Sequence, residues 1–247
     1  MRRVLLLATG DTIAYSTRPE RPGVASGAQL LETVPTDMLT ADVVAEDVLA
    51  EPSWDMAPAT MLRLARRARE AILNQGFDGV VITHGTDTLE ETAFLVDLLA
   101  GQAAHYGGIV LTGATRPFDA LSADGPRNLA SSLAAAADPA LCGAGAVVCV
   151  NDELHAARWV TMVDATGVSA FSSAPEPVLG RVVGGRAEIS TVPPGRPPTV
   201  AGDPETDVAL IKTYPGMDSA LLTAVVDAGV RRAGPLEGRL VGWPVEI

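Results

Sequence analysis

The apolar positions of the chain fall into two repeating patterns. Short runs that are apolar at almost every position occur at 4–9, 79–84, 108–113, 146–151 and 208–214. Unbroken runs of this kind are typical of strands that are buried on both faces of a sheet. Between them, apolar residues recur at helical spacing over 57–73, 88–100, 124–137 and 218–229. This alternation predicts an α/β fold with a doubly wound, mostly parallel sheet.

Clusters of polar residues follow four of the predicted strands. They are Thr9–Thr12, Thr83–Thr88, Thr112–Arg116 and Asn151–Asp152. In open α/β sheets, ligands bind in the crevice at the carboxyl ends of the strands. We therefore expect the functional site to be built from these clusters.

The chain changes in composition near its C-terminal quarter. Residues 184–207 contain five prolines and few apolar residues, which indicates a linker. The predicted organisation is an α/β domain over 1–183, a linker over 184–207 and a C-terminal part over 208–247. That last part holds one predicted strand and one predicted helix, so we expect an incomplete small α/β domain.

Charge and composition exclude several functions. The 247 residues carry a formal net charge of −12, so nucleic acid and membrane surfaces are poor candidate partners. The two cysteines predict neither a disulfide framework nor a zinc site. The apolar run at 4–8 is too short for a signal peptide, and no 18-residue apolar stretch occurs. We expect a soluble cytoplasmic protein.

Candidate chemistry lies in the first two polar clusters. Thr12 stands at a strand end beside Gly10, a plausible position for a hydroxyl nucleophile, although an ordinary turn explains it as well. Thr86 and Asp87 fall where the backbone N–H groups of the next helix are free. Thr88 is expected to cap that helix, with a glutamate three residues later. His84 is either a base or, more commonly at a strand end, a structural hydrogen-bonding residue.

Five motifs resemble, in the same order, those of the bacterial L-asparaginase/glutaminase family. They are "TGDTIA", "EPSWDM", "ITHGTDTLEETA", "LTGATRPFDALSADGPRNL" and "NDELHAARWVT". The resemblance runs from about residue 3 to about residue 229. It implies hydrolysis of the side-chain amide of asparagine, often also of glutamine, without a metal or organic cofactor. It also implies an acyl-enzyme on a threonine, and sites formed between the subunits of an oligomer.

The resemblance assigns roles to individual residues. It makes Thr12 the nucleophile, and Thr86 a residue that helps to activate the nucleophile or water. Asp87 would bind the α-amino group of the substrate, which suits a carboxylate facing an ammonium. Ser53 would hold the substrate carboxylate. Tyr15 corresponds to a tyrosine of the family's flexible loop, with a shorter spacing, and Ala114 of "LTGAT" would border the substrate.

Four positions depart from the family pattern. The family lysine of "VTKT" is Met162, and the only lysine of the chain is Lys212. The second glycine of "TGGTIA" is Asp11, whose carboxylate either disfavours a developing oxyanion beside Thr12 or serves as a new base. Trp54 replaces a glutamine that contacts substrate, and Thr115 replaces a methionine. Loss of a positioned acid–base group typically lowers a rate about 10²–10⁴-fold.

Three interpretations follow from these residues. The chain is an asparaginase-type amidohydrolase of weak or altered specificity, an enzyme repurposed from one, or a non-catalytic binding protein that keeps the fold. The first two share a small-molecule partner, an amino-acid amide or a related compound. An apolar helix face, Leu221, Leu222, Val225 and Val226, is typical of a subunit interface. We therefore expect a homo-oligomer, a dimer or a tetramer.

Overall fold

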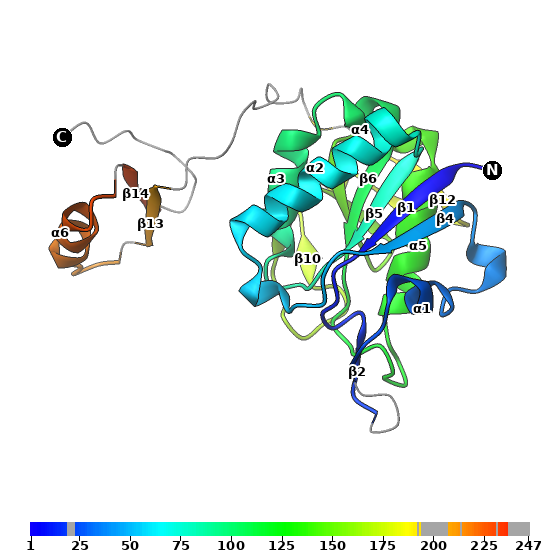
Figure 1. Ribbon diagram of the computed structural model, residues 1–247, viewed down its shortest axis with the longest axis horizontal. Coiled ribbons are helices and arrows are strands. Elements are labelled where there is room, and N and C mark those ends of the chain that lie inside the picture. The colour runs from blue at the N-terminus through cyan, green and yellow to red at the C-terminus, as the bar shows by residue number, and fades with distance from the viewer. Residues whose placement is uncertain (19–22, 192, 194–206, 213, 231, 237–247) are drawn as a thin grey trace. The chain divides into compact units, whose positions relative to one another are not determined.

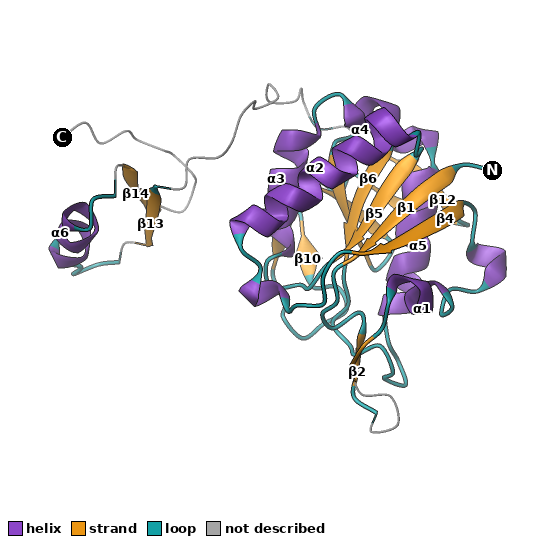
Figure 2. Cartoon of the chain, in the orientation of Figure 1, coloured by secondary structure: helices purple, strands orange, loops and turns teal. Residues whose placement is uncertain are grey.

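The computed structural model describes the chain except for residues 19–22, 192, 194–206, 213, 231 and 237–247 (Figure 1). It forms two compact units, Met1–Val200 and Ala201–Ile247. The N-terminal unit is a central sheet with helices packed on both faces (Figure 2). The candidate chemistry of the sequence lies in this unit.

The sheet of the N-terminal unit has eight strands in the order β12-β11-β8-β7-β6-β5-β1-β4. Their bounds are β1 Arg3–Ala8, β4 Asp42–Asp47, β5 Gly79–Thr83, β6 Gly108–Thr112, β7 Ala146–Val150, β8 Glu153–Ala156, β11 Gly180–Val183 and β12 Arg186–Ile189. The pairs β4–β1, β1–β5, β5–β6 and β6–β7 are parallel. The pairs β7–β8, β8–β11 and β11–β12 are antiparallel. The predicted doubly wound, mostly parallel sheet is confirmed.

Helices cover both faces of this sheet. They are α1 Gly27–Leu31, α2 Pro58–Gln75, α3 Leu89–Ala100, α4 Ala103–Tyr106 and α5 Gly125–Ala137. Residues of α2, α3 and α4 share one core with Leu5 and Leu7, whereas residues of α1 and α5 share the other with Val4 and Leu6. Alternate side chains of β1 thus enter opposite cores. This explains why its sequence is apolar without a break.

Short elements connect the main ones. An antiparallel ribbon joins β2 (Tyr15–Ser16) to β3 (Gly23–Val24), and a second joins β9 (Thr161–Met162) to β10 (Phe171–Ser172). The 3-10 turns are η1 Thr36–Met38, η2 Ser53–Asp55 and η3 Pro139–Leu141. Of these, β2, β9 and η2 carry residues of the candidate site.

The strand order creates a switch point beside β1. The chain passes from β1 to β4 on one side, and then crosses to β5 on the other side of β1. The loops that leave β1 and β5 therefore diverge at the carboxyl ends of these strands, which is where open α/β sheets bind their ligands. Thr9–Thr12 follow β1 and Thr83–Thr88 follow β5. The predicted position of the polar clusters is confirmed.

The predicted boundary at residue 183 differs from the structure. Residues Arg186–Ile189 of the predicted linker form the edge strand β12, and the N-terminal unit extends to Val200. The hairpin turns at Gly184 and Gly185, whose φ angles are 57° and 75°. Adjacent glycines with positive φ are the usual signal of a two-residue hairpin loop. Most of the remaining predicted linker lies outside the described residues.

The described residues of the C-terminal unit form one strand–helix–strand arrangement. Strand β13 (Val208–Lys212) pairs in parallel with β14 (Arg232–Leu236), and α6 (Ala220–Asp227) connects them. The strand predicted at 208–214 and the helix predicted at 218–229 are confirmed, whereas β14 was not predicted. Over the described ranges of both units, no helix is long and apolar enough to cross a membrane.

Candidate active site

Buried threonines tie neighbouring strand ends together below the functional loops. The Thr9 hydroxyl donates to the Thr83 carbonyl over 2.6 Å, and the Thr112 hydroxyl donates to the Cys149 carbonyl over 2.7 Å. The three threonine side chains are completely buried. A buried hydroxyl that satisfies a strand-end carbonyl is structural, because neither group can reach water. These contacts fix the floor from which the functional loops leave.

The loop after β1 makes a sharp turn at Gly10 and Asp11. Their φ angles are 89° and 65°, in the region that side chains rarely adopt. A Cβ on Gly10 would lie 2.9 Å from the Ala50 Cα, so only glycine fits there. The Asp11 carbonyl then accepts the backbone N–H groups of Ala14 and Tyr15, both over 2.8 Å. The turn leaves Thr12 half-buried.

The Asp11 carboxylate joins this loop to η2. Its Oδ1 accepts the Thr12 backbone N–H over 2.6 Å and the Thr12 hydroxyl over 3.1 Å. Its Oδ2 accepts the Ser53 backbone N–H over 2.6 Å. One carboxylate thus brings together Thr12 and Ser53, which are far apart in the sequence. The contact of Asp11 with Thr12 was anticipated from sequence, whereas its contact with Ser53 was not.

The loop after β5 closes the other side of this cluster. The Ser53 side chain is completely buried, and its hydroxyl lies 3.4 Å from Asp87 Oδ2. A Cβ on Gly85 would lie 1.8 Å from Asp11 Oδ2 and 2.3 Å from Ser53 Oγ. Gly85 therefore has no room for a side chain. Asp11, Ser53 and Asp87 form a contiguous row of polar groups.

Thr88 does not have the predicted capping role. It occupies the N-cap position of α3, but its hydroxyl makes no capping hydrogen bond. The hydroxyl donates instead to the Ser53 carbonyl over 2.8 Å. The capping-box prediction is therefore wrong, because a tertiary partner competes for the same hydroxyl. The consequence is that Thr88 anchors η2 to the start of α3.

His84 is a structural residue. Its ring is completely buried, with Nδ1 2.8 Å from the Gly85 carbonyl oxygen and Nε2 2.8 Å from the Thr92 hydroxyl. Burial lowers the pKa of the imidazole below its ordinary value. The neutral ring holds the loop after β5 against α3. This agrees with the structural interpretation of the sequence.

The remaining predicted residues lie around this cluster. Thr86 is half-buried, and its methyl group lies 3.5 Å from the point that a Cβ on Gly113 would occupy. Ala114 is buried after β6. The side chains of Tyr15 and Trp54 are 51% and 67% exposed. Trp54 therefore turns most of its indole to solvent, although it neighbours Ser53 in sequence.

Met162 stands on β9 beside the first turn of α3. Its side chain is partly buried and packs on the core below α2 and α3. Its backbone N–H donates to Glu90 Oε2 over 2.5 Å. The nearby Arg158 forms an ion pair with Asp97, with 3.1 Å between their nitrogen and oxygen atoms. The position at which the resemblance leads us to expect a lysine therefore carries a thioether, and the Glu90 carboxylate accepts its backbone N–H.

Asp124 organises the loop after β6. Its carboxylate accepts the backbone N–H groups of Thr115 and Arg116 over 3.1 and 3.0 Å, the Thr115 hydroxyl over 3.1 Å and the Asn128 amide over 3.2 Å. Thr115 thereby has a structural role. In the described part of the chain, no group of three or more His, Cys, Asp or Glu side chains is arranged to hold a metal ion.

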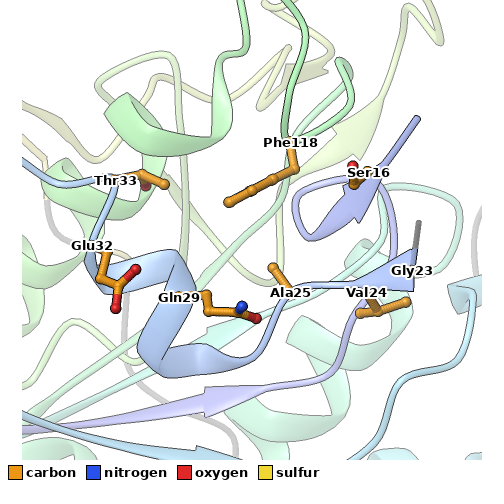
Figure 3. A pocket seen from close by; sticks show the side chains of 8 residues that line it. All are labelled: Ser16, Gly23, Val24, Ala25, Gln29, Glu32, Thr33 and Phe118. Carbon is orange, nitrogen blue, oxygen red and sulfur yellow. The ribbon is translucent and has the colours of Figure 1, made fainter. Parts of the chain in front are cut away.

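A separate hollow lies between the β2–β3 ribbon and α1. Its volume is about 510 Å³, and Figure 3 shows Phe118 reaching into it. It is lined by Ser16, Gly23, Val24, Ala25, Gln29, Glu32, Thr33 and Phe118. None of the residues of the Asp11 cluster contributes to this lining. The hollow is therefore distinct from the candidate active site.

The sequence profile of a family described as "Asparaginase, N-terminal" matches residues 3–194. This chain belongs to the asparaginase family. Among curated members, it is 36% identical over 176 residues to L-asparaginase 2 of Bacillus subtilis, and the alignment covers 69% of this chain and 46% of that protein. It is 34% identical over 226 residues to the glutaminase-asparaginase of Pseudomonas fluorescens, which covers 89% of this chain and 60% of that protein. The chain therefore spans about half the length of these relatives.

The fold agrees with the family assignment. The structure of a probable cytoplasmic L-asparaginase from Campylobacter jejuni superposes with a TM-score of 0.83 at 30% sequence identity. The superposition covers 95% of this chain and 74% of that one. The asparaginase-like α/β fold is thus common to both proteins.

Proposed function

We propose that this chain is a threonine-dependent amidohydrolase that acts on a small amide. The observation that carries the proposal is the hydrogen bond from the Thr12 hydroxyl to Asp11 Oδ1, at 3.1 Å. A hydroxyl is a weak nucleophile until a neighbouring base accepts its proton. Here a carboxylate is within hydrogen-bond reach of the hydroxyl, at the switch point of an α/β sheet.

The proposed reaction has two steps. Thr12 Oγ attacks the amide carbon while its proton passes to Asp11 Oδ1, and the C–N bond breaks when that proton is delivered to the leaving nitrogen. The products of this step are ammonia and an ester on Thr12. A water molecule then hydrolyses the ester, which releases the acid and regenerates the hydroxyl. Asp87, exposed at the start of α3, would bind an ammonium group of the substrate.

Met162 supports an altered substrate or reaction. A thioether can neither carry a proton nor hold a positive charge, so the site lacks the ammonium that the family motif supplies. The carboxylates of Asp11 and Glu90 lie within hydrogen-bond distance of Thr12 and of the Met162 backbone, respectively. A proton route through Asp11 therefore replaces the route through lysine.

A non-catalytic binding role is the second candidate. The observation that favours it is that the polar groups of Ser53 already have partners within the protein. Its N–H, hydroxyl and carbonyl contact Asp11, Asp87 and Thr88, respectively. A serine enclosed in this way is less available to a substrate than an open one. In this case the site would bind a ligand without attacking it.

The experiment that separates the two candidates is ammonia release by the full chain. The substrates are L-asparagine, L-glutamine and 3-aminopropanamide, and the proteins are the wild type, Thr12→Ala and Thr12→Ser. The amidohydrolase predicts that Thr12→Ala lowers release at least about 10²-fold, while Thr12→Ser retains measurable release. Equal release by the wild type and Thr12→Ala would assign the activity to a contaminant. No release from any substrate would favour the binding role.

A further inference from the structure

The Asp11 carboxylate occupies a position that suits a ligand carboxylate. Its two oxygens accept the Thr12 N–H, the Thr12 hydroxyl and the Ser53 N–H, at 2.6, 3.1 and 2.6 Å. Backbone N–H groups from two separate loops that converge on one carboxylate are typical of anion recognition. The protein supplies this anion itself, so an external carboxylate would have to displace it.

The charges around Ser53 also disfavour an anionic ligand. Asp11 Oδ2 lies 2.6 Å from the Ser53 nitrogen, and Asp87 Oδ2 lies 3.4 Å from its hydroxyl. Neither carboxylate takes part in any ion pair formed between described residues. Because like charges at short range repel each other, a carboxylate at this place would be bound weakly. An ammonium group would be attracted by both aspartates.

Gly85 keeps the Asp11 carboxylate at this place. The point that a Cβ on Gly85 would occupy is 1.8 Å from Asp11 Oδ2, so the carboxylate rests directly on the backbone of the loop after β5. The backbone of Asp11 is itself fixed by the turn with φ of 65°. The carboxylate is therefore held between three chain segments, those around Thr12, Ser53 and Gly85.

We propose that Asp11 determines substrate specificity. It excludes amides that carry a carboxylate as well as an ammonium group, and it favours amides that carry the ammonium group alone. The proposal rests on the site described under the proposed function, and it names the class of substrate for that site. The class is that of ω-amino amides. The simplest member is 3-aminopropanamide, which is asparagine without its α-carboxylate.

Three ligands isolate the two charges. L-Asparagine has both the ammonium and the carboxylate, 3-aminopropanamide has only the ammonium, and succinamate has only the carboxylate. Binding is measured by isothermal titration or ligand-observed NMR with the full chain carrying Thr12→Ala, so that no ligand is consumed. We expect 3-aminopropanamide to bind about 10- to 100-fold more tightly than L-asparagine, the range that one charged hydrogen bond spans. Succinamate is expected to bind most weakly.

Two substitutions of Asp11 test its part in this preference. In the Thr12→Ala chain, Asp11→Asn removes the charge and keeps the shape, and Asp11→Gly also frees the Ser53 N–H and suits the positive φ. Both should reduce or reverse the preference, and Asp11→Gly should do so more strongly. The control is Asp37→Asn, which removes an exposed charge on η1 and should leave the preference unchanged.

The outcomes separate this inference from the proposed reaction. Tighter or equal binding of L-asparagine to the Thr12→Ala chain would overturn the role of Asp11, and so would a preference unaffected by both Asp11 variants. The role of Asp11 would also be overturned if none of the three ligands bound. Absence of ammonia release from the wild type, with the binding preference intact, would reject hydrolysis and leave the specificity assignment standing.

Discussion

Thr88→Val tests how η2 is held at the site. The substitution keeps the shape of the side chain and removes the hydroxyl that donates to the Ser53 carbonyl over 2.8 Å. That carbonyl keeps a second donor, the Met56 N–H at 3.0 Å, so it is not left without a partner. The loss is therefore that of one ordinary hydrogen bond, about 0.5–1.5 kcal/mol of unfolding free energy. For a unit of this size, each 1 kcal/mol shifts the melting temperature by about 2–4 °C.

Thermal unfolding by circular dichroism, together with hydrogen exchange, measures this effect. We expect Thr88→Val to melt a few degrees below the wild type, with faster exchange at the backbone amides of η2. The matched control is Thr40→Val at an exposed threonine, which should change the melting temperature by less than about 2 °C. If Thr88→Val melts with the wild type, or exchange at η2 is unchanged, Thr88 does not anchor η2.

Three further predictions concern activity, pH and assembly. If the missing lysine limits the rate, Met162→Lys should raise the rate of L-asparagine hydrolysis about 10²–10⁴-fold, whereas the control Met162→Leu should leave it unchanged. An unchanged rate in Met162→Lys would mean that the site is reshaped beyond this residue. Burial lowers the pKa of His84 in the folded chain, so the unfolded chain binds a proton at this imidazole more readily. The free energy of unfolding should therefore fall as the pH drops below about 6.5, by up to about 1.4 kcal/mol per pH unit. Urea unfolding at pH 7.5 and 5.5 should show this loss, and His84→Gln should reduce it. On α6, the apolar residues Leu221, Leu222 and Val226 are 52%, 40% and 46% exposed, and we predict that this face joins two copies of the chain. Leu222→Glu should therefore lower the sedimentation coefficient. A wild type that sediments as a monomer at micromolar concentration would refute the interface.

The parallel strands in the middle of the sheet could be predicted from sequence, because both of their faces are buried. The strands β1, β5, β6 and β7 are buried at nearly every position, so their apolar runs were clear. The edge strand β4 was not predicted, because Asp42, Glu46 and Asp47 interrupt its pattern. The edge strand β12 was assigned to the linker for a similar reason. Edge strands contribute fewer buried side chains, and their signal is correspondingly weak.

The site could be predicted only in part. Strand–helix alternation was sufficient to place Thr12, Thr86 and Asp87 at the same edge of the sheet. The contact of Asp11 with the Ser53 backbone could not be predicted, because it depends on how η2 packs against the loop after β1. The true partner of Thr88 was missed for the same reason. Local motifs describe which groups are available, whereas tertiary packing decides which of them meet.

The conformation of Asp11 bears on whether its presence is functional or incidental. A residue other than glycine at a φ of 65° adds strain of about 1 kcal/mol or more, which glycine avoids. At this position the strain is offset by three hydrogen bonds from Thr12 and Ser53, two of them at 2.6 Å. A substitution that was merely tolerated would be expected at a position without such cost, and with its side chain in solvent. Asp11 instead combines a strained backbone with a carboxylate enclosed by the loops of the site, which favours a selected role in binding or catalysis.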